Sequence, residues 1–156
     1  MSLIDTAAAT LKDLQLEATK VEGFPVLNLN VKIPNGKLDM FIHAHEDTQR
    51  LLVYSRPQGM VVRHDDIPRL ADFINRANYG LPLGNFELDM NDGELNFKNS
   101  VDVKDGTLTK EMVETLVKFS IECVNRYLPG LEAVLAGKNP KDAIESIDGP
   151  SKIRIT

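Results

Sequence analysis

The chain has 156 residues, with 18 basic and 23 acidic side chains, and 42% of its residues are apolar. This length fits one domain with its own hydrophobic core, and the composition is that of a folded protein rather than a disordered one. A net charge of -5 disfavours non-specific binding to nucleic acid and to anionic lipid, because both depend on clustered Lys and Arg. We therefore expect neither a nucleic-acid partner nor a membrane partner.

The single cysteine, Cys123, cannot form an intramolecular disulfide, and the first residues lack the basic and apolar regions of a signal peptide. No stretch approaches the ~20 apolar residues of a membrane helix. These features predict a cytoplasmic protein. Cys123 lies in the apolar stripe of a predicted helix, which indicates a buried structural residue, because a catalytic thiol needs exposure and a basic neighbour.

The first third of the chain predicts a helix and three strands. Apolar residues recur at helical spacing from Ser2 to about Thr19, and after Pro25 the apolar period changes to two. Strands are expected at 27–33, 38–44 and 50–56. The Pro34-Asn35-Gly36 segment is typical of a tight hairpin turn, in which Asn-Gly takes positive φ angles. The three strands should form an antiparallel meander.

The middle of the chain predicts a second helix and two more strands. An aspartate cap at 65 or 66, Pro68 in the first turn and Gly80 just past the end indicate a helix that ends at Tyr79. Alternating residues predict strands from Phe86 to Met90 and from Glu94 to about Val103. They are joined by a hairpin turn at Asn91-Asp92-Gly93.

The last third of the chain is predicted to be helical. Thr109 is the expected N-cap of a helix of about 20 residues, and Pro129-Gly130 should break or kink it. A short further helix is expected at 140–147. The segment Ser151–Thr156 is expected to be a loose tail, or an additional strand because Ile153 and Ile155 alternate with polar residues.

The element order is helix, three strands, helix, two strands, helix. It predicts an α+β fold in which helices cover one face of a five-stranded antiparallel sheet. We expect one domain over residues 1–148 and a C-terminal tail over 149–156.

His43 and His45 are the best candidates for a metal site. Residues i and i+2 of a strand point to the same side, so one ion could reach both imidazoles, and Glu46, Asp47 or His64 could add a ligand. A structural metal site usually has four placed ligands, so a solvated polar strand face is the competing interpretation. A metal- or small-ligand-binding sensor that uses His43 and His45 is our alternative function, and no cofactor is predicted.

No catalytic constellation is apparent in the sequence. It contains no phosphate-binding loop, no dinucleotide fingerprint and no Gly-x-Ser-x-Gly elbow. The segment Asp89–Glu94 resembles the start of a calcium loop, but its glycine comes one residue early and no bidentate Glu follows. The sequence therefore predicts a protein that is not an enzyme.

Phe41, Leu52 and Tyr54 lie on strand faces opposite the main alternating apolar sets. Monomers rarely expose large contiguous apolar patches. These residues therefore either pack under helices or loops, or form a surface for self-association or for a partner.

The second half of the chain resembles the YbjN family of bacterial sensory-transduction-regulator-like proteins, over about Leu70 to Ile147. The segments that carry this resemblance are turns and core positions: Leu70-Ala-Asp-Phe-Ile-Asn-Arg-Ala-Asn-Tyr79, Leu83-Gly-Asn-Phe-Glu-Leu-Asp89, Asp92-Gly-Glu-Leu-Asn-Phe97, Asp105-Gly-Thr-Leu-Thr109, Tyr127-Leu-Pro-Gly-Leu-Glu-Ala-Val134 and Gly137-Lys-Asn-Pro-Lys-Asp-Ala-Ile144.

Family members look like the class I type III secretion chaperones in fold, which are small, acidic, cytoplasmic homodimers that bind extended segments of partner proteins. The resemblance implies a homodimeric, non-enzymatic protein-binding or regulatory module that could bind an extended segment of another protein. We expect the second helix and the fourth strand to build the dimer contact, through Leu70, Phe73, Ile74, Ala77 and Phe86.

Overall fold

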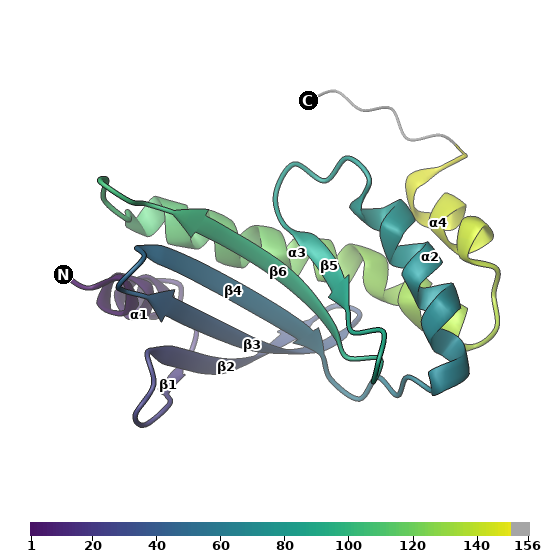
Figure 1. Cartoon of the computed structure of the whole chain (residues 1–156), viewed down its shortest axis with the longest axis horizontal. Helices are drawn as coiled ribbons and strands as arrows, with labels where there is room; N and C mark the ends of the chain where they lie inside the picture. The colour runs from purple at the N-terminus through teal and green to yellow at the C-terminus, as the bar shows by residue number, and fades with distance from the viewer. Residues whose placement is uncertain (151–156) are drawn as a thin grey trace.

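Helices and one antiparallel sheet make up the computed structural model, which describes residues 1–150 (Figure 1). In chain order the elements are α1 (Leu3–Asp13), β1 (Thr19–Lys20), β2 (Val26–Ile33), β3 (Gly36–His45), β4 (Arg50–Pro57), the short 3-10 helix η1 (His64–Asp66), α2 (Ile67–Asn78), β5 (Asn85–Leu88), β6 (Leu95–Asp102), α3 (Lys110–Leu135) and α4 (Pro140–Asp148). The α+β fold class is confirmed. The tail predicted at Ser151–Thr156 lies outside the described residues.

Within residues 1–150 the sheet has six strands in the order β1-β2-β3-β4-β6-β5, one more than predicted. The additional strand arises because α1 ends at Asp13 rather than near Thr19, and Gln15 then takes a positive φ of 58°. The chain reverses there, and Thr19 and Lys20 pair with Asn28 and Leu27 of β2. The predicted length of the first helix was therefore wrong.

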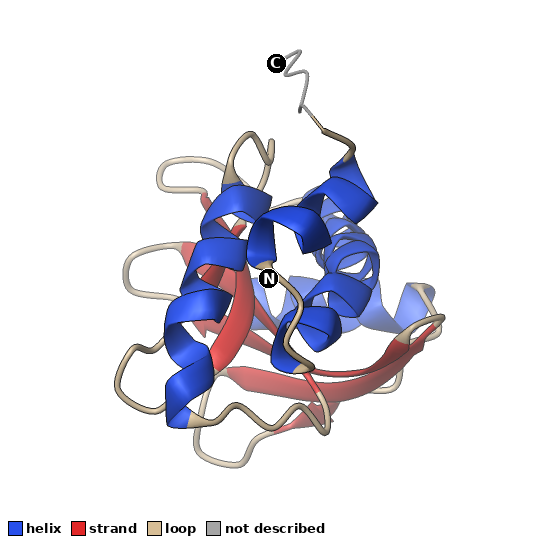
Figure 2. Ribbon diagram, turned by 90° about the vertical axis from the view of Figure 1, so that its right-hand side faces the viewer, coloured by secondary structure: helices blue, strands red, loops and turns tan. Residues whose placement is uncertain are grey.

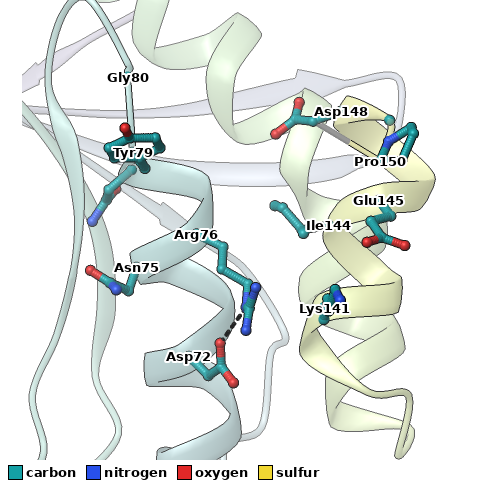
Figure 3. A pocket seen from close by; sticks show the side chains of 12 residues that line it. Asp72, Asn75, Arg76, Tyr79, Gly80, Lys141, Ile144, Glu145, Asp148 and Pro150 are labelled. Carbon is teal, nitrogen blue, oxygen red and sulfur yellow. Dashed lines mark hydrogen bonds and ion pairs between the residues drawn. The ribbon is translucent and has the colours of Figure 1, made fainter. Parts of the chain in front are cut away.

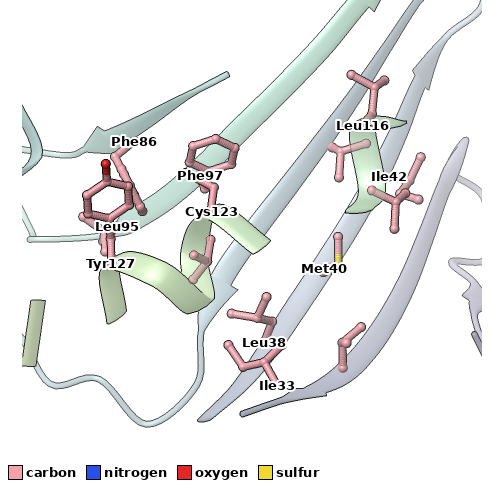
Figure 4. Packing of buried hydrophobic residues seen from close by; sticks show 14 of the residues in the cluster. Ile33, Leu38, Met40, Ile42, Phe86, Leu95, Phe97, Leu116, Cys123 and Tyr127 are labelled. Atoms are coloured by element: carbon pink, nitrogen blue, oxygen red, sulfur yellow. The ribbon is translucent and has the colours of Figure 1, made fainter. Parts of the chain in front are cut away.

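The helices lie on one side of the sheet (Figure 2). Strand residues that point toward them are fully buried, as Met40, Ile42 and Val53 show with 0% exposure. Figure 4 shows Cys123 and Tyr127 of α3 packed beside this layer, and Cys123 is buried as predicted. Hydrophobic burial between α3 and the sheet is thus the main source of stability for the fold.

Helix α3 continues through Pro129, so the predicted break at Pro129-Gly130 was wrong. Proline has no N–H, so the carbonyl of Asn125, four residues earlier, loses its helical donor. The side-chain amide of Asn35 donates to that carbonyl at 2.8 Å, and Asn125 Oδ1 accepts from the Asn35 backbone N–H at 2.9 Å. The turn between β2 and β3 thereby supplies the hydrogen-bond donor that the proline removes from the helix.

Two glycines mark places where elements approach closely rather than places where the chain turns. A Cβ on Gly130 would lie 2.5 Å from Phe73 Cζ and 2.6 Å from Ile147 Cδ1, so this glycine lets α2 and α4 pack on α3. A Cβ on Gly36 would lie 2.9 Å from Leu128 Cδ2. The predicted positive φ at Asn35-Gly36 was wrong, whereas Gly93 in the second hairpin does take a φ of 79°.

Candidate functional site

The side of the sheet opposite α1 and α3, here called the open face, is not covered by any described helix (Figures 1 and 2). Five half-buried residues lie side by side on it and form what we call the central patch: Val26, Phe41, His43, Leu52 and Tyr54. In the strand register Phe41 pairs with Tyr54, and His43 lies between Val26 and Leu52. Phe41, Leu52 and Tyr54 therefore do not pack under a helix.

Ion pairs border the central patch on its β4 and β6 side. Arg50 pairs with Asp102 at 2.9 Å, Arg56 pairs with Glu94 at 2.7 Å, and Lys98 pairs with Glu87. Such exposed pairs contribute at most about 1 kcal/mol each to stability. Their main consequence is that this side of the patch is close to neutral, although the whole chain has a charge of -5.

His43 and His45 lie together on the open face, with ring centroids 4.1 Å apart. Burial and the neighbouring His45 lower the pKa of His43 below its usual value of 6.5. The carboxylate of Glu46 is used elsewhere, because it accepts the N–H groups of Leu3 and Ile4 at the start of α1, both at 3.1 Å. His64 lies in η1, which follows the opposite end of β4. Within residues 1–150 no three His, Cys, Asp or Glu side chains are grouped to hold a metal ion.

The edge of the sheet at β5 is closed by a side chain. Asn78, the last residue of α2, accepts the N–H of Phe86 at 2.6 Å and donates to the carbonyl of Phe86 at 3.0 Å. These two bonds occupy backbone groups that an added strand would need. The sequence alone did not reveal this role, although Asn78 lies in one of the segments that carry the family resemblance.

The edge at β2 is covered only in part. Strand β1 pairs with Leu27 and Asn28 alone, so the remainder of β2, to Ile33, has no strand partner on that side among the described residues. The side chains of Asn30 and Lys32 are exposed there. The two ends of the sheet therefore differ in their ability to accept another strand.

The residues predicted for the dimer contact lie inside the core of a single chain. Leu70, Phe73 and Ala77 are 0% exposed, Phe86 is 2% exposed and Ile74 is 7% exposed. Their neighbours are α3, α4 and β5 of the same chain. These side chains leave almost no surface for a second chain, so an Asp at Ile74 would test folding rather than dimerisation.

A groove of about 740 Å³ lies between the outer sides of α2 and α4 (Figure 3). Its charged lining residues have both signs: Asp72, Arg76, Lys141, Glu145 and Asp148. Arg76 is paired with Asp72 at 2.6 Å, and Asp148 accepts the hydroxyl of Tyr127 at 2.9 Å. Desolvation and Asp148 raise the pKa of that tyrosine far above its usual range. Among the described residues that line the groove, no serine, cysteine or histidine is present to serve as an activated nucleophile or its base.

The architecture is that of an α+β domain with helices on one face of an antiparallel sheet, and comparison with known proteins assigns its family. The family model of YbjN, described as "Putative bacterial sensory transduction regulator", matches residues 5–133. The chain therefore belongs to the YbjN family, as the sequence resemblance predicted. A search of curated proteins finds no match.

Solved structures that are similar to the chain include the following three. YbjN from E. coli, described as a putative transcription regulator, is 22% identical with a TM-score of 0.62, and the match covers 85% of this chain and 92% of that one. A chain of the HopA1–SchA chaperone–effector complex is 14% identical, with a TM-score of 0.46 over 85% and 92%. A chain of the ExsC–ExsE complex is 14% identical, with a TM-score of 0.49 over 81% and 96%. Within the described residues, no helix has the length and apolar character needed to cross a membrane.

Proposed function

We propose that this chain is a non-enzymatic, regulatory protein-binding module that forms a homodimer through the open face of its sheet and acts in the cytoplasm. The central patch is the observation that supports the dimer. It places a phenylalanine, a leucine and a tyrosine on a surface that no described helix covers. Aromatic side chains are enriched in the buried centres of protein interfaces. The family description as a sensory transduction regulator supports the regulatory role.

The charge distribution of the open face favours a second copy of the chain as the partner. Two copies that each carry a charge of -5 repel one another at most surfaces. The ion pairs on the β4 and β6 side of the central patch neutralise that part of its rim, which lowers the repulsion between two patches that meet there. A twofold contact uses the same patch on both chains and needs this self-complementarity.

The dimer would leave the outer edge of β2 available to an extended segment of another protein. Such a segment can gain affinity from main-chain hydrogen bonds to a sheet edge. The single buried cysteine, Cys123, fits a protein that works in a reducing compartment.

Light scattering coupled to size exclusion tests the dimer. The wild-type chain should have the mass of two chains, and Leu52→Glu should reduce it to that of one, because a buried carboxylate without a partner is costly. Thr115→Glu adds the same charge on an exposed position of α3 and should leave the mass unchanged. Circular dichroism checks that both variants fold. A monomeric wild type, or a Leu52→Glu variant that stays dimeric, would exclude the open face as the dimer surface.

A further inference from the structure

The outer edge of β2 presents backbone groups that no described strand uses. The carbonyl of Val26 accepts the N–H of Val21 on the β1 side at 2.9 Å, and the carbonyl of Pro25 accepts the N–H of Ala44 on the β3 side at 2.9 Å. Backbone groups alternate between the two sides of a strand. The N–H and C=O groups of Asn30 and Lys32 therefore point outward, beyond the reach of the two-residue strand β1.

Two like charges lie directly opposite one another beside this edge. Lys32 lies directly opposite Lys37 in the β2–β3 register, both side chains are exposed, and neither forms an ion pair within residues 1–150. Like charges directly opposite one another destabilise a strand pair. By contrast, the cations of β4 and β6 on the open face, Arg50, Arg56 and Lys98, each have a carboxylate partner.

The nearest acidic side chain on these strands is already engaged. Asp39, diagonal to Lys32, accepts a hydrogen bond from Gln58 Nε2 at 2.6 Å, and the same amide donates to Asn30 Oδ1 at 2.9 Å. A hollow of about 240 Å³ lies beside this network and extends from β2 across β3 to the end of β4, lined by Asn30, Val31, Lys32, Lys37 and Gln58. The edge thus combines outward backbone groups, a hollow and two lysines without partners.

We propose that this edge accepts an extended acidic segment of a partner protein, which adds to β2 as a further strand and places its carboxylates beside Lys32 and Lys37. The inference rests on the proposed protein-binding function and names the chemistry of the partner. Carboxylates at every second residue would lie on one side of the added strand, next to the lysines. A lysine on an open edge deters an apolar strand, whereas an acidic strand would neutralise it. The pair would therefore select among extended segments by charge.

Fluorescence anisotropy of two labelled nonapeptides tests the proposal. In one peptide Glu alternates with Val, and in the other Lys replaces every Glu. We expect the acidic peptide to bind wild-type protein at least about tenfold more tightly at low salt, with a preference that weakens as salt rises. The double variant Lys32→Glu/Lys37→Glu should reverse the preference. Lys104→Glu/Lys141→Glu changes the net charge equally on exposed positions elsewhere and should retain it.

Asn30→Pro tests strand addition itself. Proline at this position removes an outward N–H that the β2–β3 pairing does not use, so the fold should survive and peptide binding should be lost. Circular dichroism verifies folding. Equal binding of the two peptides, no binding by either, or a preference that survives both the charge reversal and Asn30→Pro would overturn the proposal. Light scattering of the same samples reports dimerisation separately, so this inference can fail while the proposed dimer stands.

Discussion

The two faces of the sheet use the same strands for different purposes. On the covered face, Met40, Ile42 and Val53 are completely buried under α1 and α3. On the open face, their sequence neighbours Phe41, Leu52 and Tyr54 remain half-exposed, and salt bridges border them on the β4 and β6 side. Side chains alternate along a strand. Of two adjacent strand residues, one therefore stabilises the fold, and we expect the other to contact a second chain.

Two alanine substitutions in β3 should separate these roles most strongly. Ile42→Ala should lower the free energy of unfolding by about 2–5 kcal/mol, because it leaves a cavity in the core. Phe41→Ala should cost clearly less stability in the monomer and should weaken self-association instead. Urea unfolding, followed by circular dichroism at low protein concentration, measures the first effect, and light scattering measures the second. Equal loss of stability in both variants would contradict the division between the faces.

The covered side also depends on the turn that compensates for Pro129. Asn35→Ala should lower the free energy of unfolding by about 0.5–1.5 kcal/mol, because it removes the side-chain donor to the Asn125 carbonyl. In a Pro129→Ala background the helix regains its own N–H, so the cost of Asn35→Ala should be smaller. Urea unfolding of the four proteins of this double-mutant cycle measures the coupling. An identical cost of Asn35→Ala in both backgrounds would show that the amide does not serve the proline.

Asp66, at the start of α2, should give the smallest effect, and this effect should be lost in acid. The side chain of Asp66 is 2% exposed and accepts hydrogen bonds from Arg63 and Arg69. Arg63 is the main cause that lowers the pKa of Asp66 from 3.8 to about 2. A carboxyl with a lowered folded-state pKa stabilises the fold fully above its unfolded value, and that contribution is lost as the pH falls from 3.8 toward about 2.

Urea midpoints measured across this range test the role of Asp66. Asp66→Asn should be less stable than the wild type at neutral pH, and the difference between them should shrink below pH 3.8. Asp65→Asn, at an exposed neighbouring position, is the control and should follow the wild type. A difference that stays constant with pH would argue against the charged form of Asp66 as the stabilising group.

The sequence predicted the fold where the pattern is local. The period-two runs located β2, β3 and β4, and Thr109 caps α3 as expected, since its Oγ1 accepts the Met112 N–H at 3.2 Å. Strand β1 was missed because two residues, Thr19 and Lys20, are too few to show a period. The continuous α3 was missed because its proline is compensated by Asn35, which lies 90 residues away from Asn125 in sequence.

The candidate site was also predicted only in part, because some of its features depend on contacts between residues that are far apart in the sequence. Phe41, Leu52 and Tyr54 violate the alternation, and this signal is visible in the sequence. The wide apolar stripe of α2 packs within one chain, because α3, α4 and β5 cover Phe73 and Ile74, and the dimer contact expected there stays a prediction. The closed edge at Asn78 and the open edge at Lys32 depend on strand order, which the sequence pattern did not contain.

Methyl NMR of two adjacent leucines tests the account most directly. Leu51 points to the covered face with 0% exposure, whereas Leu52 lies in the central patch. On dilution of the wild-type protein, we predict that the Leu52 methyl resonances shift as chains separate and that those of Leu51 stay constant. Leu52 resonances that do not change from dilute to concentrated protein, while the mass remains that of one chain, would contradict the open face as the surface through which this protein binds itself.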